Sequence, residues 1–300
     1  MVIDSFKALV DSVKGRPKKT IAVAMAESAD VLKGISHAHE QGLADAVLVG
    51  SRKKIVDIAD KSEIDITHFD IINTNSEAQA VVRSIQMVRE SLADTLMKGN
   101  CATATLLKGI LDKEHGIRSG KLLSHVSVFE LEMYSKLLFM SDGGMNIQPN
   151  TEEKVAIVNN AVRTVKSFGI RKPKVAMITA VEKVNYQAMP CTVDAAIIAK
   201  MAERGQIDDC VVDGPLALDN AISKKACEIK GIKSPIGGEA DILIMPDIES
   251  GNVFYKTINF FTECKVAGMV VGAQVPIVVT SRADTDETKF YSIAFAMQAS

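Results

Sequence analysis

The chain has 300 residues, 47% hydrophobic and 24% charged, a balance that is ordinary for a globular protein long enough for two domains. The formal net charge of −2 offers no bulk cationic surface, so we expect no nucleic-acid partner. No apolar run reaches the roughly 18 residues that a membrane-spanning helix needs. We therefore expect a cytoplasmic protein without membrane association.

Cysteine and histidine spacing argues against a disulfide framework and against a metal site. The five cysteines are scattered and form no CxxC pair, so we expect free and mostly buried thiols. His37 and His39 are two residues apart on an expected helix and therefore point to different sides of it. We expect no metal ion and no tightly bound cofactor.

The first part of the chain alternates short apolar runs with helical periods. Strands are expected at 20–25, 46–50, 68–72 and 94–98, and helices at about 29–41, 52–60 and 76–91. Ser76 and Gln79 have capping-box spacing at the start of the last helix. Glycines follow several helical patterns as C-terminal stops, at Gly42, Gly169, Gly205 and Gly231. This alternation is typical of a parallel sheet covered by helices.

Residues 122–140 have the pattern of two strands without a helix between them, which predicts an antiparallel excursion. Asn150 and Glu153 then have capping-box spacing for a long helix. A second series of strands is expected at 174–179, 209–213, 241–246, 267–271 and 276–280. We predict two three-layer α/β domains with mostly parallel sheets, residues 1–142 and 143–285. A terminal helix over 286–300 can pack back on the first domain.

The stretch from Ile244 to Tyr255, IMPDIESGNVFY, places Ser250, Gly251 and Asn252 between a buried strand and a helix. In an open parallel sheet, such turns lie where the strands end. A glycine there lets backbone come close, and a helix N-terminus presents N–H groups to an anion. We expect an oxyanion or a phosphate to bind at this turn.

A second turn of this kind follows the strand run 94–98. Lys98, Gly99 and Asn100 close the strand, and Thr103 lies at the start of the next helix. The arrangement indicates a binding site, and an ordinary strand-to-helix turn with a helix cap is the alternative.

A third turn follows the apolar strand 276–280. Arg282 can grip a phosphate with two parallel hydrogen bonds, and the Ser281 hydroxyl can position a reacting group. Asp286 and Glu287 offer carboxylates that can act as a base. An exposed helix-capping cluster is the alternative.

Common nucleotide and hydrolase signatures are missing. The chain has no GxGxxG and no GxSxG motif, and GIRSGK at 116–121 is one residue short of a Walker A motif. Neither a dinucleotide fold nor covalent serine catalysis has positive support.

Taken together, the motifs resemble one family. IMPDIESGNVFYK, with GGEAD before it and the Thr280-Ser281-Arg282 turn after it, resembles the signature of the phosphate acyltransferases, the phosphotransacetylase and phosphate butyryltransferase group. DTLMKGNCATAT and DGGMNIQPNTEEK are similar to other segments of that family, so the resemblance runs along the whole chain. DGPLALDNAIS and SRADTDETK favour the butyryltransferase branch.

The resemblance implies two α/β domains like those of isocitrate and isopropylmalate dehydrogenases, with the site in the cleft between them, usually in a homodimer or a higher homo-oligomer. It implies that butyryl-CoA, or another short and possibly branched acyl-CoA, reacts with phosphate to give acyl phosphate and coenzyme A. The reaction would proceed by direct attack of the CoA thiolate in a ternary complex, without a metal. Ser281 and Arg282 fall on the family's Ser-Arg pair, and the Ser250 turn would line the same pocket.

Two departures from the family pattern leave roles open. Acetyltransferases carry an aspartate where this chain has Thr288, so the base is left to neighbours such as Asp286 and Glu287. The family's arginine after the middle glycine turn has no match, and Lys108 is the nearest basic residue. Alternatives are a phosphate acetyltransferase, a non-catalytic acyl-CoA or acyl-phosphate sensor, and a metal-dependent decarboxylating dehydrogenase of similar architecture.

Overall fold

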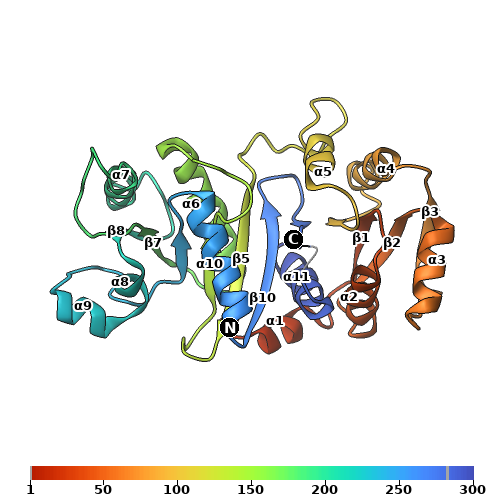
Figure 1. Ribbon diagram of the computed structural model, residues 1–300, viewed down its shortest axis with the longest axis horizontal. Coiled ribbons are helices and arrows are strands. Elements are labelled where there is room, and N and C mark those ends of the chain that lie inside the picture. The colour runs from red at the N-terminus through yellow and green to blue at the C-terminus, as the bar shows by residue number, and fades with distance from the viewer. Residues whose placement is uncertain (1, 282–283) are drawn as a thin grey trace. The chain divides into compact units, whose positions relative to one another are not determined.

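The computed structural model describes residues 2–281 and 284–300, and the chain folds into two compact units. Unit 1 comprises Met1–Ser5 and Leu122–Lys265, and unit 2 comprises Phe6–Lys121 and Val266–Ser300. Each unit is a mostly parallel β-sheet with helices packed on it (Figure 1), which confirms the predicted fold class.

The sheet of unit 2 has the strand order β3-β2-β1-β4-β11-β10. Its strands are β1 (Lys19–Ala24), β2 (Ala44–Gly50), β3 (Asp70–Asn73), β4 (Thr95–Lys98), β10 (Cys264–Val271) and β11 (Ile277–Val278). The first five strands in this order run parallel, and β10 pairs with β11 antiparallel. The carboxyl ends of five strands therefore lie along one edge of the sheet.

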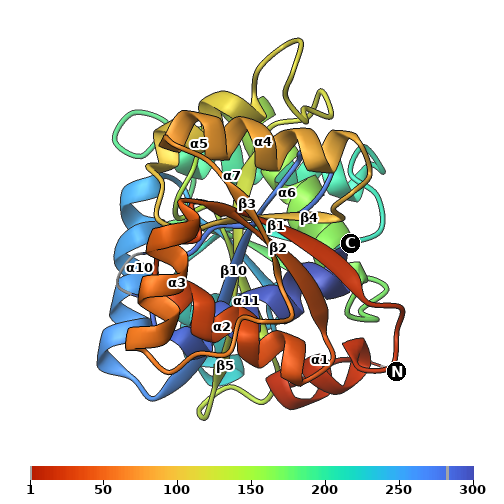
Figure 2. The same ribbon diagram turned by 90° about the vertical axis from the view of Figure 1, so that its right-hand side faces the viewer.

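Helices cover both faces of this sheet. They are α1 (Phe6–Val13), α2 (Ala29–Glu40), α3 (Arg52–Lys61), α4 (Glu77–Arg89), α5 (Thr103–Ile110) and α11 (Asp286–Ala299). Figure 2 shows α4 and α5 on one face and α1, α2 and α11 on the other. The α11 helix packs against α1 and α2, where Phe290 stacks on His37 and Tyr291 contacts Phe6. The terminal helix thus belongs with the first part of the chain.

The sheet of unit 1 has the strand order β5-β6-β9-β7-β8. Its elements are β5 (Ser124–Leu131), β6 (Leu138–Ser141), α6 (Thr151–Lys166), β7 (Lys174–Ile178), α7 (Cys191–Glu203), β8 (Val211–Leu216), α8 (Leu218–Ile222), α9 (Lys224–Lys230), β9 (Ile242–Ile244) and α10 (Ile248–Phe261). The β5–β6 pair is antiparallel and the other pairs are parallel. The predicted antiparallel excursion is therefore confirmed.

The expected domains were residues 1–142 and 143–285. The chain instead passes from unit 2 to unit 1 at residue 122 and returns to unit 2 at residue 266. Residues 122–142 belong to unit 1 because β6 pairs in parallel with β9, with Met140 beside Leu243. Residues 266–285 belong to unit 2 because β11 pairs in parallel with β4, with Val278 beside Met97. Both pairings join segments that are far apart in the sequence, so local patterns do not reveal them.

Local signals for helix ends agree with the structure. The Asn150 side chain accepts a hydrogen bond from the Glu153 N–H at 3.0 Å, and the Glu153 carboxylate accepts one from the Asn150 N–H at 2.8 Å. Ser76 caps α4 by accepting from the Gln79 N–H. The predicted stop glycines have positive φ angles, at Gly42, Gly169, Gly205 and Gly231.

The state of the cysteines and the length of the helices can be compared with the expected free thiols and the expected lack of a membrane-spanning helix. All five cysteines are free thiols, and Cys101, Cys210 and Cys227 are buried. No helix in residues 2–281 and 284–300 is both long and apolar enough to cross a bilayer.

A pH-dependent ion cluster in unit 1 gives the first prediction. The Glu239 carboxylate lies 2.8 Å from Lys174 Nζ and 2.7 Å from Lys224 Nζ. The hydrogen bond from Lys174, with that from Lys224, lowers the pKa of Glu239 from 4.5 to about 2. A depressed folded-state pKa stabilises the fold above pH 4.5, and the contribution disappears as the pH falls toward about 2. Glu239→Gln should therefore flatten the fall in melting temperature over this range.

The measurement is a series of calorimetric melts between pH 6 and pH 3, each at constant ionic strength. Glu228→Gln, the same change at an exposed position on α9, serves as the control. An equal effect of both substitutions on the slope would refute the role of the Glu239 cluster.

Candidate active site

Two of the three predicted turns meet at the carboxyl edge of the unit 2 sheet. Parallel pairing aligns Ala24 of β1 with Lys98 of β4, and Met97 of β4 with Val278 of β11. The turn that begins at Lys98 and the turn at Ser281 therefore follow neighbouring strands and leave the sheet side by side. This is the place where open α/β sheets bind their ligands.

The Lys98 turn is held against the end of β1 by backbone hydrogen bonds. The Gly99 N–H donates to the Ala24 carbonyl at 2.8 Å, and the Asn100 N–H donates to the Met25 carbonyl at 2.6 Å. A Cβ atom at position 99 would overlap the Met25 carbonyl oxygen, so this approach requires glycine. Lys98 is only 5% exposed, and its Nζ donates to the Gly99 carbonyl at 3.3 Å. The turn thus carries a buried positive charge.

The N-terminus of α5 adds to that positive potential. Thr103 is the first residue of α5. The N-cap residue, Ala102, has no side-chain oxygen that could accept a hydrogen bond from the N–H groups of the first helical turn. The Ala102 N–H donates to the Glu77 carboxylate at 3.2 Å. Helix N-termini favour anions. The binding of a phosphate or an oxyanion at this turn stays a prediction.

Cys101 lies inside this turn but is a poor nucleophile. Burial raises the pKa of its thiol, and the positive charge of Lys98 opposes that shift only in part. Because the thiolate is the reactive form, Cys101 stays an unreactive thiol near neutral pH.

The Ser281 turn is fixed by buried charges behind it. The Ser281 N–H donates to Asp284 Oδ2 at 2.7 Å, and Lys289 Nζ donates to the Asp284 carbonyl. Asp284 and Lys289 are both buried. Burial lowers the pKa of Lys289, and the carboxylates of Asp30, Asp284 and Asp286 oppose that effect. Asp284 therefore holds the Ser281 backbone in place.

The other predicted residues of this cluster occupy the start of α11. Thr285 is the N-cap and accepts a hydrogen bond from the Thr288 N–H at 3.1 Å. Asp286 and Glu287 are exposed in the first helical turn, where the helix dipole favours carboxylates. Arg282 lies outside the described residues, and the assignment of a base to Asp286 or Glu287 stays a prediction.

The third predicted turn belongs to unit 1 and differs from the expectation in one respect. The α10 helix begins at Ile248, so Ser250, Gly251 and Asn252 are its third, fourth and fifth residues and lie in the helix itself. The Asp247 carboxylate caps the helix and accepts hydrogen bonds from both the N–H and the hydroxyl of Ser250, each at 2.8 Å. The anion expected at this N-terminus is therefore supplied by the chain itself.

Gly251 brings α10 against the loop that follows β6. A Cβ atom at position 251 would overlap the Asp142 carbonyl oxygen and lie 2.8 Å from Gly143 Cα. Asn252 Nδ2 donates to the Gly143 carbonyl at 3.2 Å. Asp142 in turn accepts from the Gly144 N–H at 2.8 Å and from other neighbours. The close approach predicted for this glycine is real, and its partner is the backbone of the 142–144 loop.

Sequence reasoning did not single out the residues that hold these turns in place. Glu77 reaches the Ala102 N–H across 25 residues, so the contact forms only when α4 packs beside the Lys98 turn. Asp142 and Lys289 bond to near neighbours, the Gly144 N–H and the Asp284 carbonyl. Asp142 and Asp284, however, lie in irregular turns that have no periodic pattern. Asp247 did stand in the quoted motif, and the Asp-x-x-Ser spacing of an N-cap is the signal that identifies it.

The histidines lie in aromatic contacts rather than in a ligand cluster. His37 stacks on Phe290 and His39 on His68, so the two rings point to different partners, as predicted. Among the described residues, no three His, Cys, Asp or Glu side chains gather as ligands for a metal ion.

The fold and its turns define a class of protein. A buried lysine, a helix start without a side-chain cap and a serine turn lie together where parallel strands end, which is the usual position of a ligand site in an open α/β sheet. The "Phosphate acetyl/butaryl transferase" family model matches residues 5–84 and 74–297.

Individual relatives agree with the family match. Phosphate butyryltransferase of Clostridium acetobutylicum is 47% identical over 295 residues, which covers 98% of each chain. Phosphate acetyltransferase of Thermotoga maritima is 42% identical over 288 residues, covering 96% of this chain and 97% of its own. The crystal structure of a branched-chain phosphotransacylase from Enterococcus faecalis V583 superimposes with a TM-score of 0.82 at 32% identity, covering 94% of this chain and 98% of that one. The chain belongs to the phosphate acetyl/butyryl transferase family, a family of acyltransferases.

The packing role of Gly251 gives the second prediction. Gly251→Ala should lower the free energy of unfolding by about 1–3 kcal/mol, because the added methyl group forces α10 away from the 142–144 loop. Chemical denaturation measures this change. Gly144→Ala is the matched control, since a Cβ atom there would meet its nearest atom, in His125, at 3.5 Å. Equal losses from the two substitutions would contradict the packing argument.

Proposed function

We propose that this protein is a phosphate butyryltransferase, which converts butyryl-CoA or a branched short-chain acyl-CoA and phosphate into acyl phosphate and coenzyme A. The observation that carries the proposal is the meeting of the Lys98 turn and the Ser281 turn at one edge of the sheet, in a chain 47% identical to a phosphate butyryltransferase. The relatives include acetyltransferases, so the family alone leaves the acyl group open.

The proposed reaction needs charge stabilisation more than a strong base. In the direction of CoA acylation, the CoA thiolate attacks the acyl carbon, the new C–S bond forms, and phosphate leaves with the electron pair of the broken C–O bond. Deprotonating a thiol of pKa about 8.5 near pH 7 costs roughly 2 kcal/mol. Fixed positive potential at a developing oxyanion contributes several kcal/mol. The buried Lys98 and the α5 N-terminus supply such potential.

The roles of the site residues follow from this chemistry. Lys98, Gly99, Asn100 and Thr103 form the proposed cradle for phosphate or the oxyanion. We assign Arg282 as a phosphate anchor and Ser281 as the group that positions the reacting atoms. Asp286 or Glu287, both exposed beside the turn, is the proposed base.

In unit 1, Asn252 is exposed and is the proposed ligand contact. Ser250 and Gly251 shape the start of α10, on which Asn252 lies.

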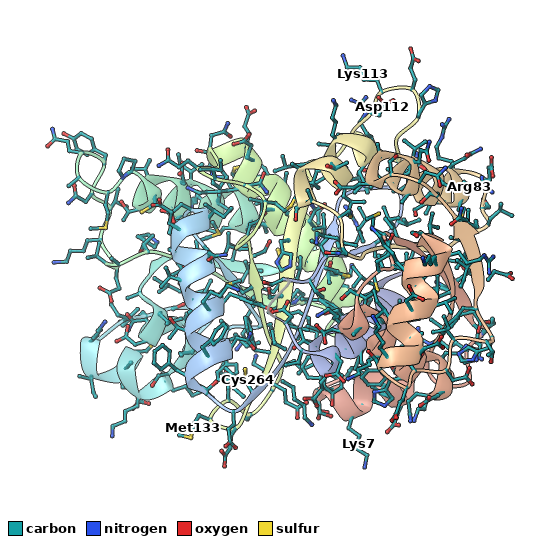
Figure 3. All side chains as sticks on the ribbon, turned by 45° about the vertical axis from the view of Figure 1, so that its right-hand side comes forward. Lys7, Arg83, Asp112, Lys113, Met133 and Cys264 are labelled. Carbon is teal, nitrogen blue, oxygen red and sulfur yellow. The ribbon has the colours of Figure 1, made fainter. Side chains whose placement is uncertain are left out.

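The third prediction tests the activity and the cradle. The wild-type protein should release CoA thiol from butyryl-CoA only when phosphate is present, measured with a thiol reagent. Lys98→Met keeps the shape of the buried side chain but removes its charge, so it should lower kcat/KM at least about tenfold. Lys113→Met, on an exposed loop in the same unit (Figure 3), should leave kcat/KM unchanged.

Other outcomes of this assay separate the alternatives. Thiol release without phosphate would indicate a thioesterase, and CoA binding without turnover would indicate a sensor. A rate panel across acetyl-, propionyl-, butyryl-, isobutyryl- and isovaleryl-CoA identifies the acyl group. Pockets that differ by a methylene discriminate by about 1–3 kcal/mol, so the ranking is measurable.

The proposal includes a homodimer in the cytoplasm, with CoA as a substrate and no tightly bound cofactor. Support for self-association comes from the C-terminal end of α10, where two aromatic side chains are exposed: Phe260 is 65% exposed and Phe261 86%. Exposed apolar patches of this kind mark protein interfaces.

The fourth prediction tests the dimer. The double substitution Phe260→Ser and Phe261→Ser should shift the protein from dimer to monomer in sedimentation velocity, because it removes two exposed aromatic rings from one helix. Met133→Ser, another exposed apolar position in unit 1, should not change the sedimentation coefficient. A double variant that sediments like the wild type would remove α10 from the interface.

A further inference from the structure

A pocket of about 450 Å³ in unit 2 lies outside the turns described above. It opens between the carboxyl end of β3 and the first turns of α4. The lining residues that carry the argument are Asn73, Thr74, Gln79, Val82, Arg83 and Gln86. This volume falls within the range of small-molecule sites.

The pocket combines an apolar surface with hydrogen-bonding groups. Val82 is 59% exposed and supplies an apolar surface to the pocket, whereas the preceding residue, Val81, is buried. Gln79 accepts a hydrogen bond from the Asn75 N–H through Oε1, which leaves its Nε2 group as a donor. The Thr74 hydroxyl is buried and has no hydrogen-bond partner within the described part of the chain. A flat heterocycle with polar edges, such as adenine, matches this combination.

Arg83 adds a phosphate-binding group at the rim of the pocket. It lies on α4 (Figure 3), and its nearest acidic partner is the Glu90 carboxylate at 3.6 Å. That exposed pair is weak, so the guanidinium remains able to bind an anion. Arginine recognises phosphate oxygens through its planar fork of N–H donors. Together the pocket and its rim suit a phosphorylated adenosine.

The distance from the pocket to the Lys98 turn matches the length of the pantetheine arm of CoA. Strand β3 is three strands away from β4 in the sheet order, and neighbouring strands lie about 4.8 Å apart, so the two carboxyl ends are roughly 14 Å apart. The pantetheine arm of CoA has about as many backbone bonds as four extended residues, which reach roughly 14 Å. One CoA molecule can therefore reach both places along the same edge.

We infer that this pocket binds the adenosine 3′-phosphate end of the CoA substrate, while the pantetheine arm runs along the sheet edge to the Lys98 turn. The inference rests on the proposed function, because that function supplies CoA as the ligand. It assigns Val82 to contact with the adenine ring and Arg83 to contact with the 3′-phosphate.

Truncated substrates test the inference. Val82→Trp fills the pocket, so it should raise KM for butyryl-CoA about tenfold and leave KM for butyryl-pantetheine unchanged. Arg83→Ala should raise KM for butyryl-CoA and leave KM for butyryl-dephospho-CoA unchanged. Leu92→Trp and Arg89→Ala, at exposed positions outside the pocket on or beside the same helix, are the matched controls.

Isothermal titration with CoA and with pantetheine, on the same variants, makes the test independent of turnover. Weaker binding of CoA, with binding of pantetheine unchanged, supports the pocket even when the protein proves catalytically silent. Equal losses for the full and truncated ligands, or no loss in either pocket variant, would overturn the inference. A wild-type protein that binds CoA without turnover refutes the proposed function alone, and one that binds no CoA refutes both.

Discussion

The parallel pairing of β11 with β4 is the contact on which the candidate site depends. It places Val278 beside Met97 and so brings the Ser281 turn next to the Lys98 turn, although the two are far apart in the sequence. The Lys98 turn is itself anchored to β1, because the Gly99 N–H binds the Ala24 carbonyl. Both turns are therefore positioned by strands rather than by flexible loops. Such rigid support is what electrostatic stabilisation of a transition state requires.

Two helix N-termini of similar sequence context have different chemical roles. The α10 N-terminus is capped by the Asp247 carboxylate, so its N–H groups serve the fold. The α5 N-terminus begins after Ala102, which has no such oxygen, and it lies beside the buried Lys98. The chain thus places a carboxylate alone at the first N-terminus, and both a carboxylate, Glu77, and the Lys98 ammonium at the second. Whether a strand-to-helix turn can bind an external anion depends on the balance of the charges that the chain already places there.

The sequence predicted those features that depend on neighbouring residues. Apolar periodicity located the strands and helices of the βα series, and the Asn150 capping box is present with both of its hydrogen bonds. It did not predict where the chain passes between the units, because that depends on the distant β6–β9 pairing. For the same reason, the pocket between β3 and α4 could not be inferred. The Asp284 contact with the Ser281 N–H spans only three residues, and it was missed because the turn has no regular pattern. Tertiary contacts, not local propensity, complete the site.

The composition of unit 2 has a consequence for the order in which the protein forms on the ribosome. Its sheet needs β10 and β11, and its α2 surface needs α11, all of which come from residues after 263. Unit 1 uses no segment beyond residue 265. During synthesis, unit 1 can therefore complete its core first. Until α11 has been synthesised, the apolar face of α2, within residues 6–121, stays uncovered. Over that interval the early segment is the part of the nascent chain that most needs protection from aggregation.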